Sequence, residues 1–113
     1  MGRYLLIDDE RGYLHIQQQH VRMYGRLNDM SELRICRSFH GGMEALKEGN
    51  WDCLYLDHDL HSYDADGRER TGTDVMNFLE QNPQFLPKRI ICVSANPVGR
   101  KRIETIIQKI YGA

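Results

Sequence analysis

Leu56-Asp57-His58-Asp59-Leu60 is the stretch that decides the fold, because a short apolar run from Asp52 to Leu56 stops there at two carboxylates and an imidazole. Two other stretches have the same form: Ile7-Asp8-Asp9-Glu10-Arg11 follows the apolar run 4–7, and Val93-Ser94-Ala95-Asn96-Pro97 follows the run 90–93. Short runs that are apolar on both faces are typical of parallel strands covered by helices. Three such strands are therefore predicted to end in polar residues at one edge of a parallel sheet.

Helical patterns alternate with these strands. We expect a helix from Tyr13 to Leu27 with a ragged apolar stripe, and a short one over 43–47 that Gly41-Gly42 opens and Gly49 closes. A third helix is capped by Thr71 or Thr73 and ends at 82–83, and the last begins near Pro97 and ends at Gly112. Its apolar positions form the clearest amphipathic stripe in the sequence: Ile103, Ile106, Ile107 and Ile110.

The remaining segments complete the chain. Residues 28–31 are predicted to form a loop, and 34–39 an edge strand, because polar and apolar residues mix there. Trp51 is expected to cover the end of the second helix. Residues 61–70 are polar, contain the turn Asp66-Gly67 and are too long for a minimal link, so they indicate a mobile flap over the site.

Four strand-helix units in 113 residues indicate one domain over residues 1–113. Right-handed crossovers predict a three-layer, doubly wound α/β structure with a four-stranded parallel sheet. If the first two units wind one way and the later ones the other, the strand order is 2-1-3-4. The winding then reverses between the strand that ends at Asp8 and the strand that ends at Asp57. Ligands of such sheets bind in the crevice at that reversal.

Composition excludes several classes of protein. The chain is 41% hydrophobic and 27% charged, as an ordinary globular domain is, and its 15 basic and 16 acidic residues give no global field for DNA readout. The three cysteines are read as buried thiols: Cys36, Cys53 and Cys92 have no zinc spacing and no even disulfide framework. No apolar run is long enough for a membrane span or a leader, so we expect a cytoplasmic protein.

The acidic residues at the strand ends predict a metal site. Asp8, Asp9 and Asp57 on adjacent strands would repel one another unless a cation or a proton lay between them. Mg2+, or Mn2+ in its place, prefers such oxygen ligands and commonly completes its shell with phosphate oxygens. The alternative is that Asp8 and Asp9 only cap the following helix.

A phosphate site is expected beside the metal. The Ser94 hydroxyl could donate to a phosphoryl oxygen, and the helix that begins near Pro97 would direct its amino end to the same space. Arg100 could add a bidentate contact, and we assign Asn96 and Arg11 to the same phosphate. The alternative for the basic cluster 100–102 is a solvated helix face.

The catalytic assignment is Asp57, His58 and Asp59. Between two carboxylates, His58 could act as a general acid or base, and it could equally be a packed, hydrogen-bonded histidine. Asp59 could act through its backbone carbonyl or its carboxylate. His61, in the expected flap, is a weaker candidate on the same edge.

The paired acids after the first strand, Asp57 after the third and Ser94 after the fourth resemble the receiver domain of response regulators. The resemblance implies that Asp8 and Asp9 hold magnesium, that Asp57 accepts a phosphoryl group, and that Asp59 supplies a carbonyl ligand. Receivers have a fifth strand and a lysine there, whereas this chain ends after its fourth helix. The resemblance therefore implies a truncated, flavodoxin-like receiver fold that lacks the fifth strand.

Four blocks of the sequence are similar to a divergent family, the cyclic-phosphate-processing receiver domains. They are Leu6-Ile7-Asp8-Asp9-Glu10-Arg11, the Leu56–Leu60 stretch, Thr71-Gly72-Thr73-Asp74-Val75 and Ser94-Ala95-Asn96-Pro97-Val98-Gly99-Arg100. The sequence departs from that family at two positions: Val93 stands where a histidine is expected, and His61 stands where a glycine is expected.

This second resemblance implies a magnesium-dependent phosphoesterase that acts on a cyclic phosphate, such as a cyclic nucleotide or an RNA end with a 2′,3′-cyclic phosphate. Two other functions stay open: a regulatory receiver that is phosphorylated at Asp57, and a nucleotide-binding protein without hydrolytic activity. The predicted partner is a phosphate-containing small molecule or an RNA end. A homodimer through the Ile90–Val93 edge or the last helix is also predicted, because that apolar edge needs cover.

Overall fold

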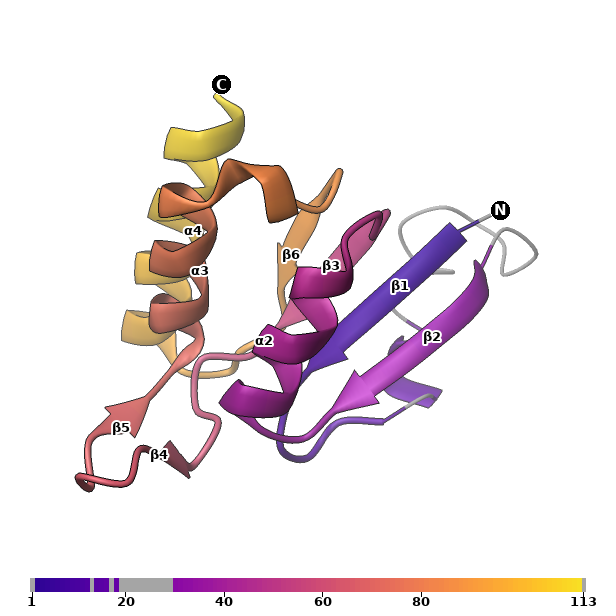
Figure 1. Ribbon diagram of the computed structural model, residues 1–113. Coiled ribbons are helices and arrows are strands. Elements are labelled where there is room, and N and C mark those ends of the chain that lie inside the picture. Colours follow the sequence, from indigo (N-terminus) through magenta and orange to yellow (C-terminus); the bar gives the residue numbers. More distant parts are fainter. Residues whose placement is uncertain (1, 13, 17, 19–29, 113) are drawn as a thin grey trace.

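The computed structural model describes residues 2–12, 14–16, 18 and 30–112 (Figure 1). Most of the helix predicted over 13–27, and residues 28 and 29 of the predicted loop, lie outside these residues. Leu14, His15, Ile16 and Gln18 are helical. None of the described helices is long and apolar enough to cross a membrane.

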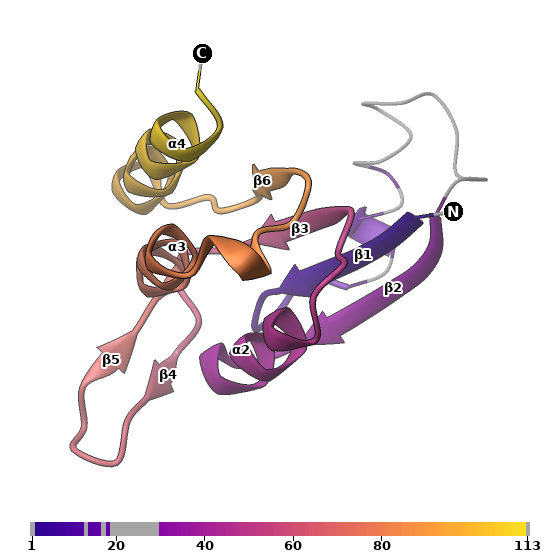
Figure 2. The same ribbon diagram turned by 45° about the horizontal axis from the view of Figure 1, so that its top comes forward.

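The central sheet contains the four predicted parallel strands. They are β1 (Gly2–Ile7), β2 (Met30–Cys36), β3 (Cys53–Leu56) and β6 (Ile90–Cys92). Their order is β2-β1-β3-β6, so the predicted order 2-1-3-4 and the α/β class are confirmed (Figures 1 and 2). The residues 30 and 31 were predicted as loop, and this was wrong. Main-chain pairing of Gly2 with Met30 extends β2 through polar residues.

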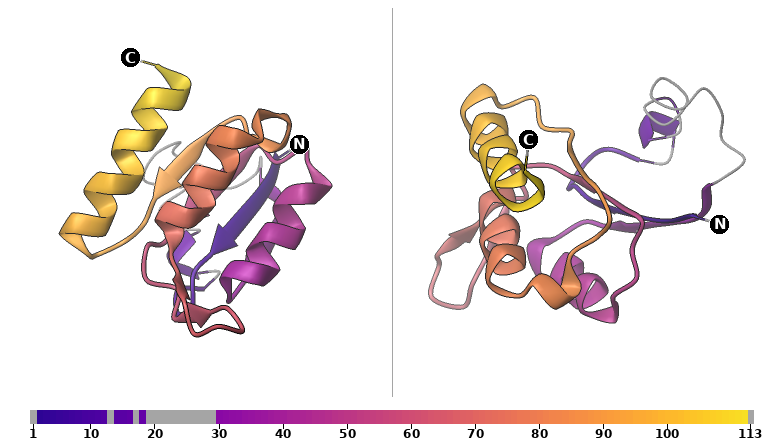
Figure 3. Two further views of the ribbon diagram at one scale, coloured as in Figure 1. Left: turned by 60° about the vertical axis from the view of Figure 1, so that its left-hand side comes forward. Right: turned by 90° about the horizontal axis from the view of Figure 1, so that it is seen from above.

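Side chains alternate between the two faces of the sheet along each strand, so the strands contribute to two apolar layers. Leu5 and Leu56 belong to a core shared with α2, α3 and α4, whereas Leu6 and Tyr55 face the opposite side, where Ile16 packs. All five side chains are fully buried. Figure 3 shows α2 and α3 on one face of the sheet and the helical residues 14–16 on the other. The sheet is therefore covered on both faces, as its apolar strands predicted.

Helix α2 (Phe39–Glu48) begins earlier than predicted. Ser38 is its N-cap, since the Ser38 hydroxyl accepts a hydrogen bond from the Gly41 nitrogen at 3.0 Å. Gly42 lies inside the helix, where an added Cβ would be only 2.5 Å from Cδ1 of Ile7. The glycine thus allows α2 to approach β1 closely and does not open the helix. Gly49 ends α2 with a φ of 77°, as predicted.

The two later helices confirm their predicted limits. Thr71 is the N-cap of α3 (Gly72–Gln81) and forms a capping box with Asp74, and the short 3-10 helix η1 (Pro83–Phe85) follows. Pro97 opens α4 (Pro97–Tyr111), and Ile103 on its inner face is fully buried.

Residues 62–70 form a hairpin within the segment that was predicted as a flap, and the predicted mobility stays a prediction. Strands β4 (Ser62–Tyr63) and β5 (Glu69–Arg70) pair antiparallel (Figure 2). The hairpin is fixed to α2, because the Phe39 nitrogen donates to the Ser62 hydroxyl at 2.9 Å. It lines a groove of about 440 Å³ with α2 and α3. Strand residues 62–63 and 69–70 thus lie beside the helices, and the residue before them, His61, reaches the site.

Candidate functional site

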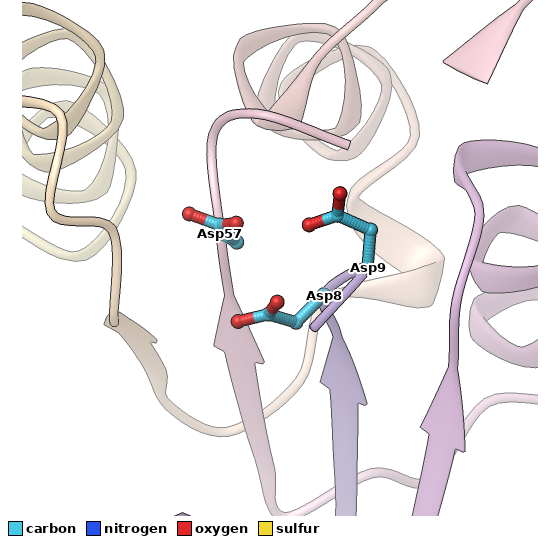
Figure 4. Close-up of side chains that lie close together, drawn as sticks. All are labelled: Asp8, Asp9 and Asp57. Carbon is cyan, nitrogen blue, oxygen red and sulfur yellow. The ribbon is translucent and has the colours of Figure 1, made fainter. Parts of the chain in front are cut away.

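Three carboxylates meet at the carboxyl ends of β1 and β3. Ile7 pairs with Leu56, so the next residues, Asp8 and Asp57, lie side by side. Asp9 follows in the loop (Figure 4), and one oxygen from each of the three carboxylates lies within 4.8 Å of the others. The structure therefore brings together the three predicted metal ligands.

Asp8 is completely buried and fully hydrogen-bonded. Its Oδ1 accepts the backbone N–H groups of Glu10 at 2.8 Å and Arg11 at 3.1 Å. Its Oδ2 accepts the Arg11 guanidinium at 2.8 Å. Asp8 thus shapes the loop that follows β1 in addition to facing the other carboxylates.

Asp57 is buried beside Asp8, and this position raises its pKa. Burial is the main cause, and the negative charge of Asp8 adds to it. The backbone N–H of His58 at 2.9 Å, the charge of Arg11 and the Ser94 hydroxyl act in the opposite direction. Asp57 is accordingly a carboxylate that would be stabilised by additional positive charge.

Arg11 supplies positive charge to both Asp8 and Asp57. Its Nη1 atom lies 2.8 Å from Oδ2 of Asp8 and 3.6 Å from Oδ2 of Asp57. Burial tends to lower the Arg11 pKa, but the hydrogen bond and charge of Asp8 outweigh it and raise the pKa. The side chain predicted to hold phosphate therefore holds two carboxylates in this structure.

His58 packs against a helix. A Cβ at Gly99 would lie 2.2 Å from the ring carbon Cγ of His58, so α4 touches the imidazole directly. The ring is 12% exposed, and its Nδ1 lies 3.0 Å from Oδ1 of Asp59. In the main chain, the Gly72 nitrogen donates to the His58 carbonyl. The packed alternative for His58 therefore matches the geometry.

His61 reaches the carboxylates instead. Its Nδ1 lies 2.5 Å from Oδ2 of Asp9, and this contact raises the pKa of the imidazole. The His61 backbone has a φ of 50°, in the left-handed region that favours glycine. This conformation explains why a glycine is expected at this position of the family pattern. Here it carries an imidazole that is 68% exposed.

The predicted phosphate ligands differ in what they contact. Ser94 is buried beside Asp57. The Asn96 side chain is the N-cap of α4, because its Oδ1 accepts the nitrogens of Val98 and Gly99 at 3.1 Å. Since Asn96 occupies the amino end of α4, that end is less open to an anion than predicted.

Arg100 and Asp59 lie at the margin of the site. Nη1 of Arg100 donates to the Ser94 carbonyl at 3.3 Å, and its Nε lies 3.3 Å from Oε2 of Glu104. The Asp59 side chain is 47% exposed, and its bonds to His58 and Asn96 lower its pKa. Arg100 is therefore paired with Ser94 and Glu104, and Asp59 with His58 and Asn96, in this structure.

A cleft of about 170 Å³ joins the strand ends. Asp9 and Asp57 line it together with one imidazole and one guanidinium, whereas the buried Asp8 is not part of its lining, nor are His58 and Arg100. The lining residues are Asp9, Glu10, Arg11, Asp57, Asp59, His61, Ser94, Ala95 and Asn96. Sequence reasoning had given Glu10 no role and had ranked His61 below His58.

The donor set fits a hard divalent cation. Magnesium binds oxygens octahedrally at about 2.0–2.1 Å, which places neighbouring ligand oxygens about 3 Å apart and opposite ones about 4 Å apart. The observed separations of up to 4.8 Å are close enough for side-chain rotations to reach that geometry. All three ligands are carboxylates, which Mg2+ and Mn2+ prefer.

Comparisons with known proteins agree with this geometry. Residues 3–109 match the family model described as the cyclic-phosphate processing receiver domain. The chain belongs to this family. The resemblance seen in the four sequence blocks is thereby confirmed, and no curated protein matches the sequence.

Two solved structures share the fold of this receiver domain. One is a fusion that contains the trimeric coiled coil of yeast Spc42, with 15% identity and a TM-score of 0.60 over 94% of this chain. This chain spans 62% of that fusion. The other is the MaeR response regulator bound to beryllium trifluoride, with 15% identity and a TM-score of 0.59 over 98% of this chain and 77% of that one. At this identity the likeness shows the receiver fold alone.

Proposed function

We propose that this receiver domain is a magnesium-dependent phosphoesterase that opens a cyclic phosphate. The observation that supports this most is the cluster of three carboxylates at the strand ends, two members of which, Asp9 and Asp57, line one cleft together with an imidazole and a guanidinium. The family description, cyclic-phosphate processing, names the substrate class that such a cleft suits. Asp8, Asp9 and Asp57 would hold Mg2+, or Mn2+ in its place.

When bound, the divalent ion supplies polarisation of a phosphoryl oxygen and a water of lowered pKa. The protein supplies the proton transfer. The contact between His61 Nδ1 and Asp9 fixes the ring and leaves Nε2 as the nitrogen that can accept a proton from water. The water oxygen bonds to phosphorus, one ring P–O bond breaks, and the released alkoxide takes the proton from the imidazolium.

The size of the cleft suggests how the substrate sits. Pockets that enclose a whole small ligand have volumes of about 300–1,000 Å³, whereas this cleft has about 170 Å³. The phosphate would therefore lie inside, beside Ser94 and Arg11, and the rest of the substrate outside. A cyclic mononucleotide and a cyclic-ended RNA would both satisfy this arrangement.

Hydrolysis assays test the proposal. Purified protein with Mg2+ is incubated with 2′,3′-cyclic mononucleotides, cyclic-ended RNA and cyclic dinucleotides, with Asp57→Asn as the control. His61→Ala should lower kcat by about 10² to 10⁴, the usual contribution of a general acid or base. His58→Ala should retain more of the activity. Failure of every substrate to exceed the Asp57→Asn control would exclude the phosphoesterase.

A regulatory receiver is the second candidate, because Asp57 follows β3 of a receiver fold beside a buried serine. Incubation with a small phosphodonor and intact-mass measurement distinguishes the two functions. A stable phosphoryl adduct that Asp57→Asn abolishes would favour regulation. Tight nucleotide binding by calorimetry without product would favour the non-hydrolytic binding protein.

A further inference from the structure

Arg11 contacts two of the three carboxylates that would bind a metal ion. Its guanidinium contacts Oδ2 of Asp8 at 2.8 Å and lies 3.6 Å from Asp57. The other Asp8 oxygen accepts two backbone N–H groups that form the loop after β1. Oδ2 is therefore the Asp8 oxygen that can be released by rotating a side chain, without breaking the loop.

We propose that Arg11 is an internal counter-cation, which a divalent ion displaces from Asp8 and Asp57 and which then becomes the phosphate contact. This inference rests on the metal site of the proposed function. Adjacent buried carboxylates require a positive charge or a proton. Arg11 provides the charge before the ion binds, and the ion provides a larger one afterwards.

The loop permits this exchange because its backbone is held independently of the guanidinium. The Arg11 nitrogen donates to Oδ1 of Asp8, and the Arg37 guanidinium donates to the Arg11 carbonyl. Arg37 contacts main-chain oxygens of the loop, at Asp8 and Arg11. The Arg11 side chain can thus move while its Cα stays at the cleft.

The exchange couples two binding events. While Arg11 is paired with Asp8 and Asp57, Nη1 of its fork of donors is engaged by these carboxylates, so the whole fork is not available to clamp a phosphate. Once the ion has taken the carboxylates, the same fork is released at the lining of the cleft. By linkage, phosphate and metal should each increase the affinity for the other, and part of this coupling belongs to Arg11.

Titration calorimetry with Mg2+ alone tests the exchange. Arg11→Gln removes the competing charge, so we expect this variant to bind Mg2+ about tenfold more tightly than the wild type, the effect of one charged hydrogen bond. Arg100→Gln is the matched control, because it removes the same charge near the site without a carboxylate of the cluster as its partner. Its Mg2+ affinity should stay within about twofold of the wild type.

The calorimetry distinguishes failure of the Arg11 exchange from failure of the metal site. If Arg11→Gln binds Mg2+ with equal or lower affinity than wild type, the exchange is excluded and the metal site remains. If neither protein binds Mg2+ and both are folded, the metal site and the proposed function fail, and the exchange fails with them.

A second measurement uses the wild-type protein and does not depend on the folding of a variant. The Arg11 Nη1 hydrogens, which bond to Asp8, should shift in resonance and exchange faster with water as Mg2+ saturates the site. Adding inorganic phosphate should then slow that exchange again. An Arg11 resonance that is unchanged at saturating Mg2+ would overturn the proposal.

Discussion

Alanine at position 99 tests where the His58 ring lies. A Cβ at Gly99 would be 2.2 Å from Cγ and 2.5 Å from Nδ1 of His58. Carbon atoms in contact are normally about 3.5–4.0 Å apart. The difference between this normal distance and 2.2 Å means that either the imidazole or the first turn of α4 must move by roughly 1 Å or more. The ring has little room, because it is 12% exposed and bonded to Asp59.

Two opposing effects determine how much Gly99→Ala changes the free energy of unfolding. Overpacking of a filled position costs about 1–3 kcal/mol, whereas glycine to alanine within a helix stabilises by about 1 kcal/mol. Gly99→Ala should therefore lower the free energy of unfolding by about 0–2 kcal/mol in the wild type. In a His58→Ala background the clash is absent, and the same substitution should stabilise by about 1 kcal/mol.

Urea unfolding of the four proteins of this double-mutant cycle measures the coupling. Trp51 is the sole tryptophan and is 1% exposed, so its fluorescence reports the loss of the core. The expected coupling between positions 58 and 99 is about 1–3 kcal/mol. Additivity within about 0.5 kcal/mol would refute the packing of His58 on α4 and would restore this histidine as a catalytic candidate.

Three further predictions concern other parts of the chain. His61→Gly should be more stable than His61→Ala by about 0.5–1 kcal/mol, because both variants lose the imidazole and only glycine adopts a φ of 50° without strain. Equal stabilities of the two variants in urea unfolding would contradict the left-handed backbone at this position. Asp52 accepts a hydrogen bond from the Arg3 backbone N–H at 2.7 Å, and this bond lowers the pKa of the carboxyl group. The contribution of Asp52 to the free energy of unfolding should therefore be fully present above its unfolded pKa of about 4. It should be lost as the pH falls through the lower pKa of the folded state. The stability difference between wild type and Asp52→Asn should accordingly shrink below about pH 4, and a constant difference would exclude this linkage. The homodimer through the Ile90–Val93 edge or α4 stays a prediction, and a monomer in light scattering at micromolar concentration would exclude it.

The central strands β1, β3 and β6 were predictable from sequence because burial on both faces leaves a continuous apolar run, and each run here stops at a polar residue. The Gly41-Gly42 pair was misread for a physical reason. A glycine that opens a helix and a glycine that lets a helix approach a strand are identical in sequence, and the contact with Ile7 that distinguishes them is between distant residues. The hairpin over 62–70 was missed because its strands have two residues each, too few to show alternation.

The choice between the two histidines could have been made from the period of β3. Leu54 and Leu56 face the layer of α2, α3 and α4, and a period of two continues this face to His58, which does pack on α4. Tyr55 faces the other way, and the same period takes Asp57 away from that helix layer. The period of two does not place His61, because the left-handed backbone of this residue interrupts the alternation of side chains. Its signal is the departure from the family pattern itself: a histidine at a position that favours glycine accepts backbone strain, and in this chain the strained residue places an imidazole on Asp9.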